Sequence, residues 1–178
     1  MSAAAVAMSL SSGHAAFAQT ASSKPAPAAQ EPPSAVTFYG DPKAVISQGV
    51  AIPAGAAVFM VSGLLAPAID TTAKNDDRAR YGIDTKTQAI GIFKTMEKQL
   101  ADHGLSLKDV VYIRAYLIGD AAKGGKLDVE GWNEAYKQFF GTADNPNKTA
   151  RATIGVAALV APQFLLEVEA VAVYPTKK

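Results

Sequence analysis

The sequence predicts a single α+β domain with the element order β-β-α-β-α-β-β, preceded by a leader outside the core. Three observations support this: apolar strand-like runs near both ends of the domain, two segments with helical spacing between them, and a composition change near residue 36. Residues 1–35 contain 12 alanines and only two charged residues. The chain has 178 residues, of which 49% are hydrophobic and 19% charged, which is ordinary for one soluble domain. We therefore expect the folded domain to span residues 44–175.

The leader has features of an export signal. Ala16-Phe17-Ala18 before Gln19 fits the small-x-small pattern of a cleavage site, so residues 1–18 are predicted to be a signal peptide. This predicts a periplasmic or secreted protein. No Lys or Arg precedes the short apolar stretch, so a disordered leader on a cytoplasmic protein is the alternative. Residues 19–43 are rich in Pro, Ala and Ser and are predicted to form a flexible tether.

The first half of the domain is predicted to contain a hairpin, a loop and a helix. Residues 44–52 and 57–63 have strand composition and are separated by a Pro-Ala-Gly turn, which suggests that they pair. Residues 64–83 show no sustained period and are predicted to form a long functional or mobile loop. A helix should begin at Asp84 or Thr85 and end before Gly104. Its apolar stripe is Ala89, Ile92, Phe93, Met96 and Leu100.

The second half is predicted to contain a strand at 110–118, a helix at 127–141, and strands at 150–159 and 164–174. Two helices can cover only one face of such a sheet, so partner subunits are expected to cover the other. Aromatic residues at helical spacing on the second helix are interpreted as core packing. They are Trp132, Tyr136, Phe139 and Phe140.

Composition excludes several function classes. The chain has no cysteine and only two histidines, His14 in the leader and His103 at a helix end, which excludes thiol chemistry, cysteine zinc sites and a Ser-His-Asp triad. The formal charge is +1 with no basic run, which argues against nucleic-acid binding. No apolar run is long enough for a membrane span, and no glycine-rich phosphate loop is present.

The remaining chemistry lies on the last two predicted strands. Glu167 and Glu169 are two residues apart and therefore share one face of their strand. Arg151, on the preceding strand, could share that face. A cross-strand ion pair on a solvated sheet is the structural alternative.

Several runs together resemble the RidA (YjgF) family of enamine/imine deaminases. They are VSG at 61–63, Gln88, DVVYIRAYL at 109–117, WNEAYKQFFG at 132–141 and the run 150–175. The resemblance covers about residues 44–175. It implies a chorismate-mutase-like subunit and a homotrimer whose sheets pack at the centre, with clefts between neighbouring subunits.

The resemblance also implies residue roles. Arg151 matches the arginine that holds the substrate carboxylate, a task suited to the planar guanidinium because it can donate two parallel hydrogen bonds. Glu167 matches the residue that positions the attacking water, with Glu169 as the alternative by register. Weaker matches are Ser62 and Gly63 in the cleft wall, Asn133 in the cleft, and Thr153 near the water site.

The sequence departs from the family pattern at two positions. Ile46 stands where many members have an aromatic cleft residue, and Thr149 stands where a proline is usual. The loop 64–83 and the segment 119–128 are also longer than in the shortest members, so access to the cleft is expected to differ.

The implied function is hydrolysis of 2-imino or enamine acids to 2-keto acids and ammonia, as in a 2-iminobutanoate/2-iminopropanoate deaminase. No metal or organic cofactor is expected, because imines are electrophilic and need mainly positioning. Two alternatives stay open: a non-catalytic protein that binds small carboxylates or 2-keto acids, and a stress holdase that would not need Arg151.

Overall fold

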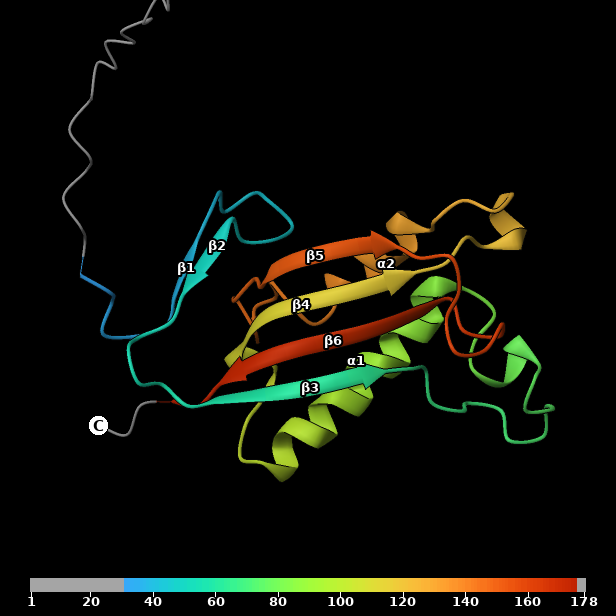
Figure 1. Ribbon diagram of the computed structural model, residues 1–178, viewed down its shortest axis with the longest axis horizontal. Helices are drawn as coiled ribbons and strands as arrows, with labels where there is room; N and C mark the ends of the chain where they lie inside the picture. Colours follow the sequence, from blue (N-terminus) through green and yellow to red (C-terminus); the bar gives the residue numbers. More distant parts are fainter. Residues whose placement is uncertain (1–30, 176–178) are drawn as a thin grey trace, which may run out of the picture. The chain divides into compact units, whose positions relative to one another are not determined.

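A computed structural model describes residues 31–175 (Figure 1). The predicted signal peptide at 1–18 and the first part of the predicted tether, 19–30, lie outside the described residues. Both stay predictions.

The central sheet has four strands in the order β3-β6-β4-β5 (Figure 1). β3 (Val58–Leu64) pairs antiparallel with β6 (Leu166–Val173), and β6 pairs antiparallel with β4 (Val110–Leu117). β5 (Ala150–Gly155) runs parallel to β4 at the far edge. A parallel pair needs a crossover connection, and the segment between β4 and β5 contains the second helix.

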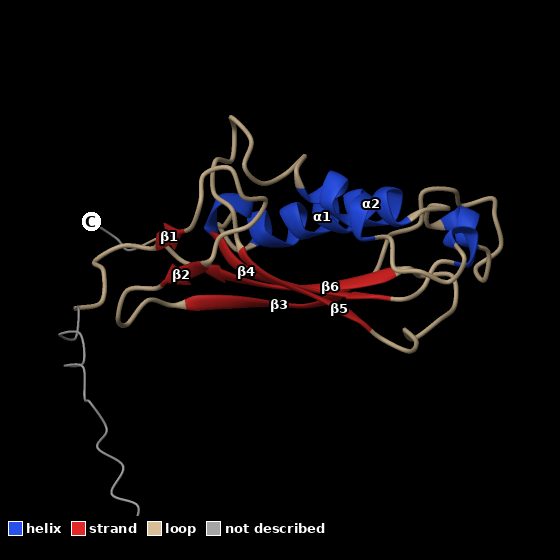
Figure 2. Cartoon of the chain, turned by 90° about the horizontal axis from the view of Figure 1, so that it is seen from above, coloured by secondary structure: helices blue, strands red, loops and turns tan. Residues whose placement is uncertain are grey.

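The two helices, α1 (Thr85–Asp102) and α2 (Val129–Tyr136), lie on one side of this sheet (Figure 2). The Asp84 carboxylate accepts a hydrogen bond from the Thr87 N–H and caps α1. Asp128 caps α2 in the same way through the Gly131 N–H. The predicted apolar stripe of α1 is completely buried against the sheet. The α+β class and the placement of both helices on one face are therefore confirmed.

The predicted hairpin between residues 44–52 and 57–63 is wrong. β2 (Gly49–Ala51) is only three residues long and pairs with an additional strand, β1 (Thr37–Tyr39), in a separate two-stranded sheet. Just before β2, the Ser47 N–H donates to the Thr149 carbonyl, which ties this segment to the start of β5. The turn at residues 53–55 does not make the two runs pair with each other. Long-range contacts hold them instead, the first run at the start of β5 and the second along β6. β1 also lies inside the predicted tether, so an ordered strand stands where flexibility was expected.

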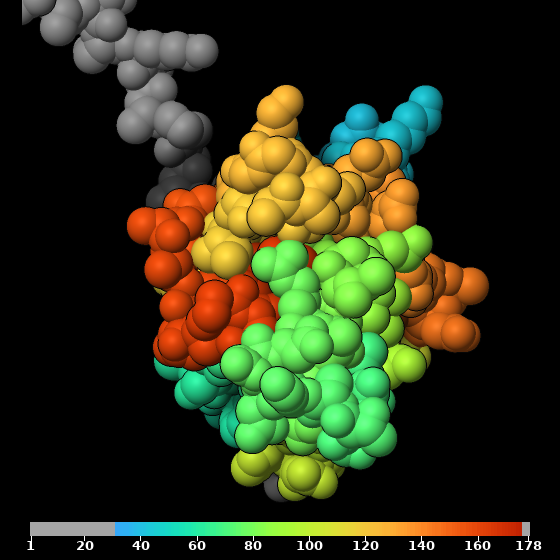
Figure 3. Space-filling model, turned by 90° about the vertical axis from the view of Figure 1, so that its right-hand side faces the viewer, coloured from blue at the N-terminus to red at the C-terminus, as the bar shows by residue number. Residues whose placement is uncertain are grey.

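Three loops meet at one end of the sheet (Figure 3). The segment 65–83 is held by Arg80, whose Nη1 donates to the carbonyls of Thr71 and Ala73 at 3.0 and 2.8 Å. Arg78 forms an ion pair at 2.8 Å with Asp120, whose side chain is only 1% exposed. The segment 156–165 joins them through the Gln163 amide, which donates to a carbonyl of the 65–83 loop. The longer segments noted in the sequence are therefore linked to one another. No helix among residues 31–175 has the length and apolarity needed to cross a membrane.

Candidate functional site

The predicted site residues divide between the two faces of the sheet. Arg151 pairs with Ile113, and Thr153 pairs with Ala115, both of which are buried beneath the helices. Glu167 instead pairs with Tyr116, whose side chain lies on the opposite face. The expectation that Arg151 shares a face with the two glutamates is therefore wrong. Strand β4 separates β5 from β6, and its alternation places the arginine and the glutamates on different sides.

Arg151 is held by side chains of helix α2. Its Nη2 donates to the Asn133 Oδ1 at 2.5 Å. Its Cζ lies 4.7 Å from the ring centroid of Tyr136 and 5.3 Å from that of Trp132. These are cation–π distances, and such contacts partly replace the lost hydration of a buried cation. Burial lowers the pKa of Arg151 from its ordinary value, but a guanidinium remains charged at neutral pH.

The Nη1 group of Arg151 is buried and has no hydrogen-bond partner among residues 31–175. An unpaired buried donor is costly, and a charged one more so. A carboxylate bound here would accept hydrogen bonds from this group and compensate the positive charge. We call Arg151, Asn133, Trp132, Tyr136 and Thr153 the arginine half-site.

Trp132 and Tyr136 were missed as candidate site residues. The prediction that they pack in the core is confirmed, since both are fully buried and the ring centroids of Trp132 and Phe93 are 5.4 Å apart. It is incomplete, because both rings also contact Arg151. The available signal was their position at i−1 and i+3 around Asn133, which places all three beside the same strand.

The second group, here called the glutamate half-site, consists of Ser62, Gly63 and Glu167. The β3–β6 register shifts between Val61 and Leu64, which places Ser62 and Gly63 in a bulge beside Glu167. A methyl group added to Gly63 would lie 1.8 Å from the Glu167 Oε1. Glycine is therefore required for the observed position of this carboxylate.

The two glutamates differ in their partners. Glu169 lies 3.6 Å from the Arg114 Nη1 and accepts a hydrogen bond from the Tyr116 hydroxyl at 3.2 Å. The ion pair expected on the sheet thus involves Arg114 rather than Arg151. Glu167 makes no hydrogen bond or ion pair within residues 31–175 and borders a hollow of about 480 Å³ beside Tyr116 and segment 156–160. Glu169 borders the same hollow, but of the two carboxylates only Glu167 has no hydrogen-bond or ion-pair partner among residues 31–175.

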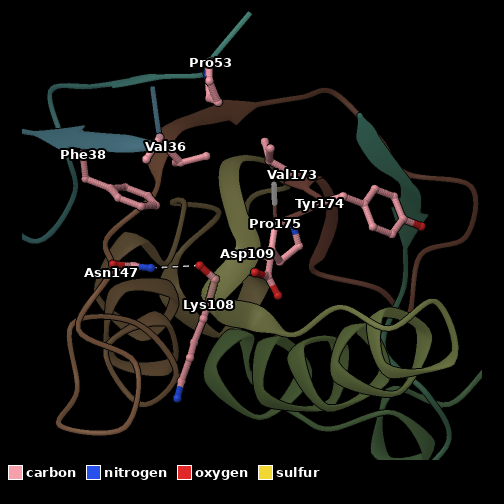
Figure 4. A pocket seen from close by; sticks show the side chains of 10 residues that line it. Val36, Phe38, Pro53, Lys108, Asp109, Asn147, Val173, Tyr174 and Pro175 are labelled. Atoms are coloured by element: carbon pink, nitrogen blue, oxygen red, sulfur yellow. Dashed lines mark hydrogen bonds between the residues drawn. The ribbon is translucent and has the colours of Figure 1, made fainter. Parts of the chain in front are cut away.

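A separate hollow of about 300 Å³ lies where β1 approaches the end of β6 (Figure 4). On one side of this hollow two polar groups already bind each other, since the Asn147 amide donates to the Lys108 carbonyl at 2.8 Å. It contains none of the predicted site residues. We assign no function to it.

The family profile described as endoribonuclease L-PSP matches residues 42–174. The chain therefore belongs to this family. The fold is similar to that of the Rid protein YyfB from Yersinia pestis, with a TM-score of 0.54, 21% identity, and coverage of 72% of this chain and 86% of that one.

Two further solved structures are similar at lower TM-scores. RidA from an Antarctic Psychrobacter has a TM-score of 0.49 and 22% identity, over 78% of this chain and 99% of that one. A YjgF/YER057c/UK114 family member from Mycobacterium tuberculosis has a TM-score of 0.48 and 23% identity, over 79% and 100%.

Proposed function

We propose that the protein hydrolyses 2-imino or enamine acids to 2-keto acids and ammonia at a site assembled from two copies of the chain. The observation that carries this proposal is the unpaired, buried Nη1 of Arg151 beside the Asn133-bound Nη2. A planar guanidinium whose Nη2 is held by Asn133 and whose Nη1 has no partner is suited to binding a small carboxylate.

The arrangement of the half-sites supports a composite site. β3 and β5 are the two edges of the four-stranded sheet, and the glutamate and arginine half-sites lie at or near these opposite edges. A head-to-tail contact between the β3 edge of one copy and the β5 edge of the next would bring complementary half-sites together. Repeating such a contact closes a ring when the rotation between copies closes, and the expected homotrimer is the smallest such ring beyond a dimer.

The reaction needs modest assistance from the protein. Arg151 holds the substrate carboxylate, and Glu167 orients a water molecule and accepts its proton as the water oxygen bonds to the imine carbon. The C=N electron pair moves to nitrogen, which takes up the proton from Glu167. The hydroxyl proton of the resulting carbinolamine then passes to the amino nitrogen, C=O forms as the C–N bond breaks, and the products are the 2-keto acid and ammonia.

A non-catalytic carboxylate-binding role is the second candidate. It is favoured by one observation: the arginine half-site is complete within one chain, whereas Glu167 lies on the other face of the sheet. Turnover of an imino acid separates the two candidates, because only the deaminase needs Glu167.

Arg151→Lys and Glu167→Gln should affect different steps. The lysine variant keeps the charge but loses the two-pronged donor, so we expect pyruvate binding to weaken by about one to two decades, or ~1.5–3 kcal/mol. The glutamine variant should bind pyruvate almost normally and release ammonia from 2-iminopropionate much more slowly. Titration calorimetry with pyruvate and an ammonia-release assay measure the two effects.

Each outcome has a definite meaning. Equal pyruvate affinity in wild type and Arg151→Lys would reject both carboxylate-based functions. Normal binding with no ammonia release by the wild type, even under semicarbazide competition, would favour the non-catalytic binder.

A further inference from the structure

Two threonines, Thr149 immediately before β5 and Thr153 within it, hold the two aromatic rings that contact Arg151. The Thr149 N–H donates to the Tyr136 hydroxyl oxygen at 2.9 Å, and the Tyr136 and Thr149 hydroxyls are 3.1 Å apart. On the other side of the arginine, the Trp132 Nε1 donates to the Thr153 Oγ1 at 3.1 Å. The three residues 149, 151 and 153 alternate along one chain segment. Each ring is therefore attached by its polar end to a residue two positions from the cation.

We propose that Thr149 is a positioning residue, which acts through Tyr136 to fix the plane of the Arg151 guanidinium for carboxylate binding. This inference rests on the proposed function. The Tyr136 ring is the nearer of the two rings, at 4.7 Å from the Arg151 Cζ. A guanidinium stacked on a ring takes its orientation from that ring, and the free Nη1 then points in a fixed direction.

The hydroxyl contact depends on the side chain of residue 149, and the backbone N–H bond requires any residue there except proline. Thr149 is fully buried, and its backbone N–H and its hydroxyl both contact the single phenol oxygen. Proline, the usual residue at this position according to the resemblance described above, has neither group. The linkage from residue 149 to Tyr136 is therefore a feature that a chain with proline cannot make.

Electrostatics is consistent with a neutral, fixed phenol. Burial raises the pKa of Tyr136, while the two contacts from Thr149 and the charge of Arg151 act in the opposite direction. The phenol remains protonated at neutral pH. It can therefore accept the Thr149 N–H and donate its own proton to the Thr149 hydroxyl, and the cation meets a neutral ring.

Packing alone is the competing explanation for the ring position, since Tyr136 also stacks on Phe140 at 4.7 Å. Tyr136→Phe separates the two, because it keeps the ring and removes only the oxygen. Thr149→Pro removes both partners of the phenol from the other side, the N–H donor and the hydroxyl acceptor. Tyr81→Phe is a matched control, because the Tyr81 hydroxyl makes no hydrogen bond within residues 31–175, while its ring packs on Phe164.

The first measurement needs no ligand. Side-chain NMR of the Arg151 guanidinium should resolve two distinct Nη groups in the wild type and in Tyr81→Phe, because rotation about the Nε–Cζ bond is hindered. In Tyr136→Phe and Thr149→Pro the two signals should broaden or merge. Thermal unfolding establishes that each variant is folded under the conditions used.

The second measurement is pyruvate binding, followed through the single tryptophan, Trp132. The loss of one net hydrogen bond corresponds to roughly a two- to tenfold weaker affinity. We expect this loss in both test variants, with a matching rise in KM for an imino acid and little change in kcat, because the carboxylate is held equally in the ground and transition states.

Failure of this inference differs from failure of the proposed function. Unchanged guanidinium signals in folded Tyr136→Phe and Thr149→Pro would overturn the positioning role, whatever pyruvate does. Altered guanidinium signals without pyruvate binding by the wild type would support the link from Thr149 to Arg151 and reject the carboxylate-based function. If the guanidinium signals change in the two variants but their pyruvate affinity equals that of the wild type, the fixed guanidinium plane does not contribute to carboxylate binding, and that part of the proposal is overturned.

Discussion

Arg151 is a partly buried cation between strand β5 and helix α2, an environment in which charged side chains are rare. Its contacts supply two kinds of compensation, a hydrogen bond to Asn133 and two aromatic faces. The buried Nη1 group is left uncompensated among residues 31–175. The family resemblance predicted Arg151 and Asn133 as site residues but not the neighbouring aromatic residues, Trp132 and Tyr136. The reason is that an aromatic residue at helical spacing has the same pattern whether or not one of its faces contacts a charge.

The close approach of Gly63 and Glu167 gives a prediction at the residue scale. Gly63→Ala should push the Glu167 carboxylate away, because the added methyl would lie 1.8 Å from its Oε1. The carboxylate ends a flexible side chain, so it can move at little cost to the fold. We expect slower ammonia release with nearly unchanged pyruvate affinity and melting temperature.

Gly49→Ala is the matched control for this prediction, since no atom of residues 31–175 beyond its chain neighbours lies within 4 Å of its added methyl. Ammonia release and calorimetry on both variants measure the effect. Normal turnover by Gly63→Ala would remove Glu167 from the role of water-positioning residue.

At the scale of elements, α2 connects stability with the arginine half-site, because it carries Trp132, Asn133 and Tyr136. Its N-cap, Asp128, also lies 3.0 Å from the Lys123 ammonium. Burial on its own would raise the pKa of Asp128. The Lys123 ammonium, the Gly131 N–H and the Thr85 hydroxyl outweigh this effect and hold that pKa below its ordinary value of 3.8.

The lowered pKa predicts the direction of a pH effect on α2. A carboxyl group whose pKa is lower in the folded state stabilises the fold above its unfolded pKa and loses this contribution as the pH falls through its folded pKa. We therefore expect wild-type stability to decline below about pH 4, with part of that decline absent in Asp128→Asn. Asparagine remains a good cap, whereas Asp128→Ala should cost about 1 kcal/mol at neutral pH. Denaturant unfolding at pH 7 and pH 3 measures both effects, and identical pH profiles for wild type and Asp128→Asn would contradict the account.

Elements were predicted with uneven success, and the reasons are physical. Helix α1 was predicted from its stripe because one face of a long helix must be buried, whatever its partner. Alternation correctly placed Glu167 and Glu169 on one face of β6. It could not indicate which face of the sheet Arg151 occupies, because that depends on strand order, and β4 lies between β5 and β6. The hairpin prediction failed for the same reason, since pairing is decided by contacts distant in sequence.

At the scale of the whole molecule, one subunit carries the two half-sites at or near opposite edges of its sheet. The face away from the helices also exposes apolar side chains of β3, including Met60, which is 74% exposed. Burial of such side chains between copies would favour assembly. Light scattering at micromolar concentration should therefore report three subunits, and a stable monomer would exclude the composite site.

The most direct test of the composite site uses two variants, each of which impairs a different half-site. Arg151→Lys retains the glutamate half-site, and Glu167→Gln retains the arginine half-site. If each site takes one half from each of two neighbouring copies, co-assembled mixed trimers contain intact sites at about a quarter of their interfaces. We predict that ammonia release from 2-iminopropionate recovers to about that fraction of the wild-type rate when the two variants are co-expressed, and not when separately assembled trimers are simply combined. Activity of co-expressed trimers that stays at the level of the separate variants would contradict a site shared between copies.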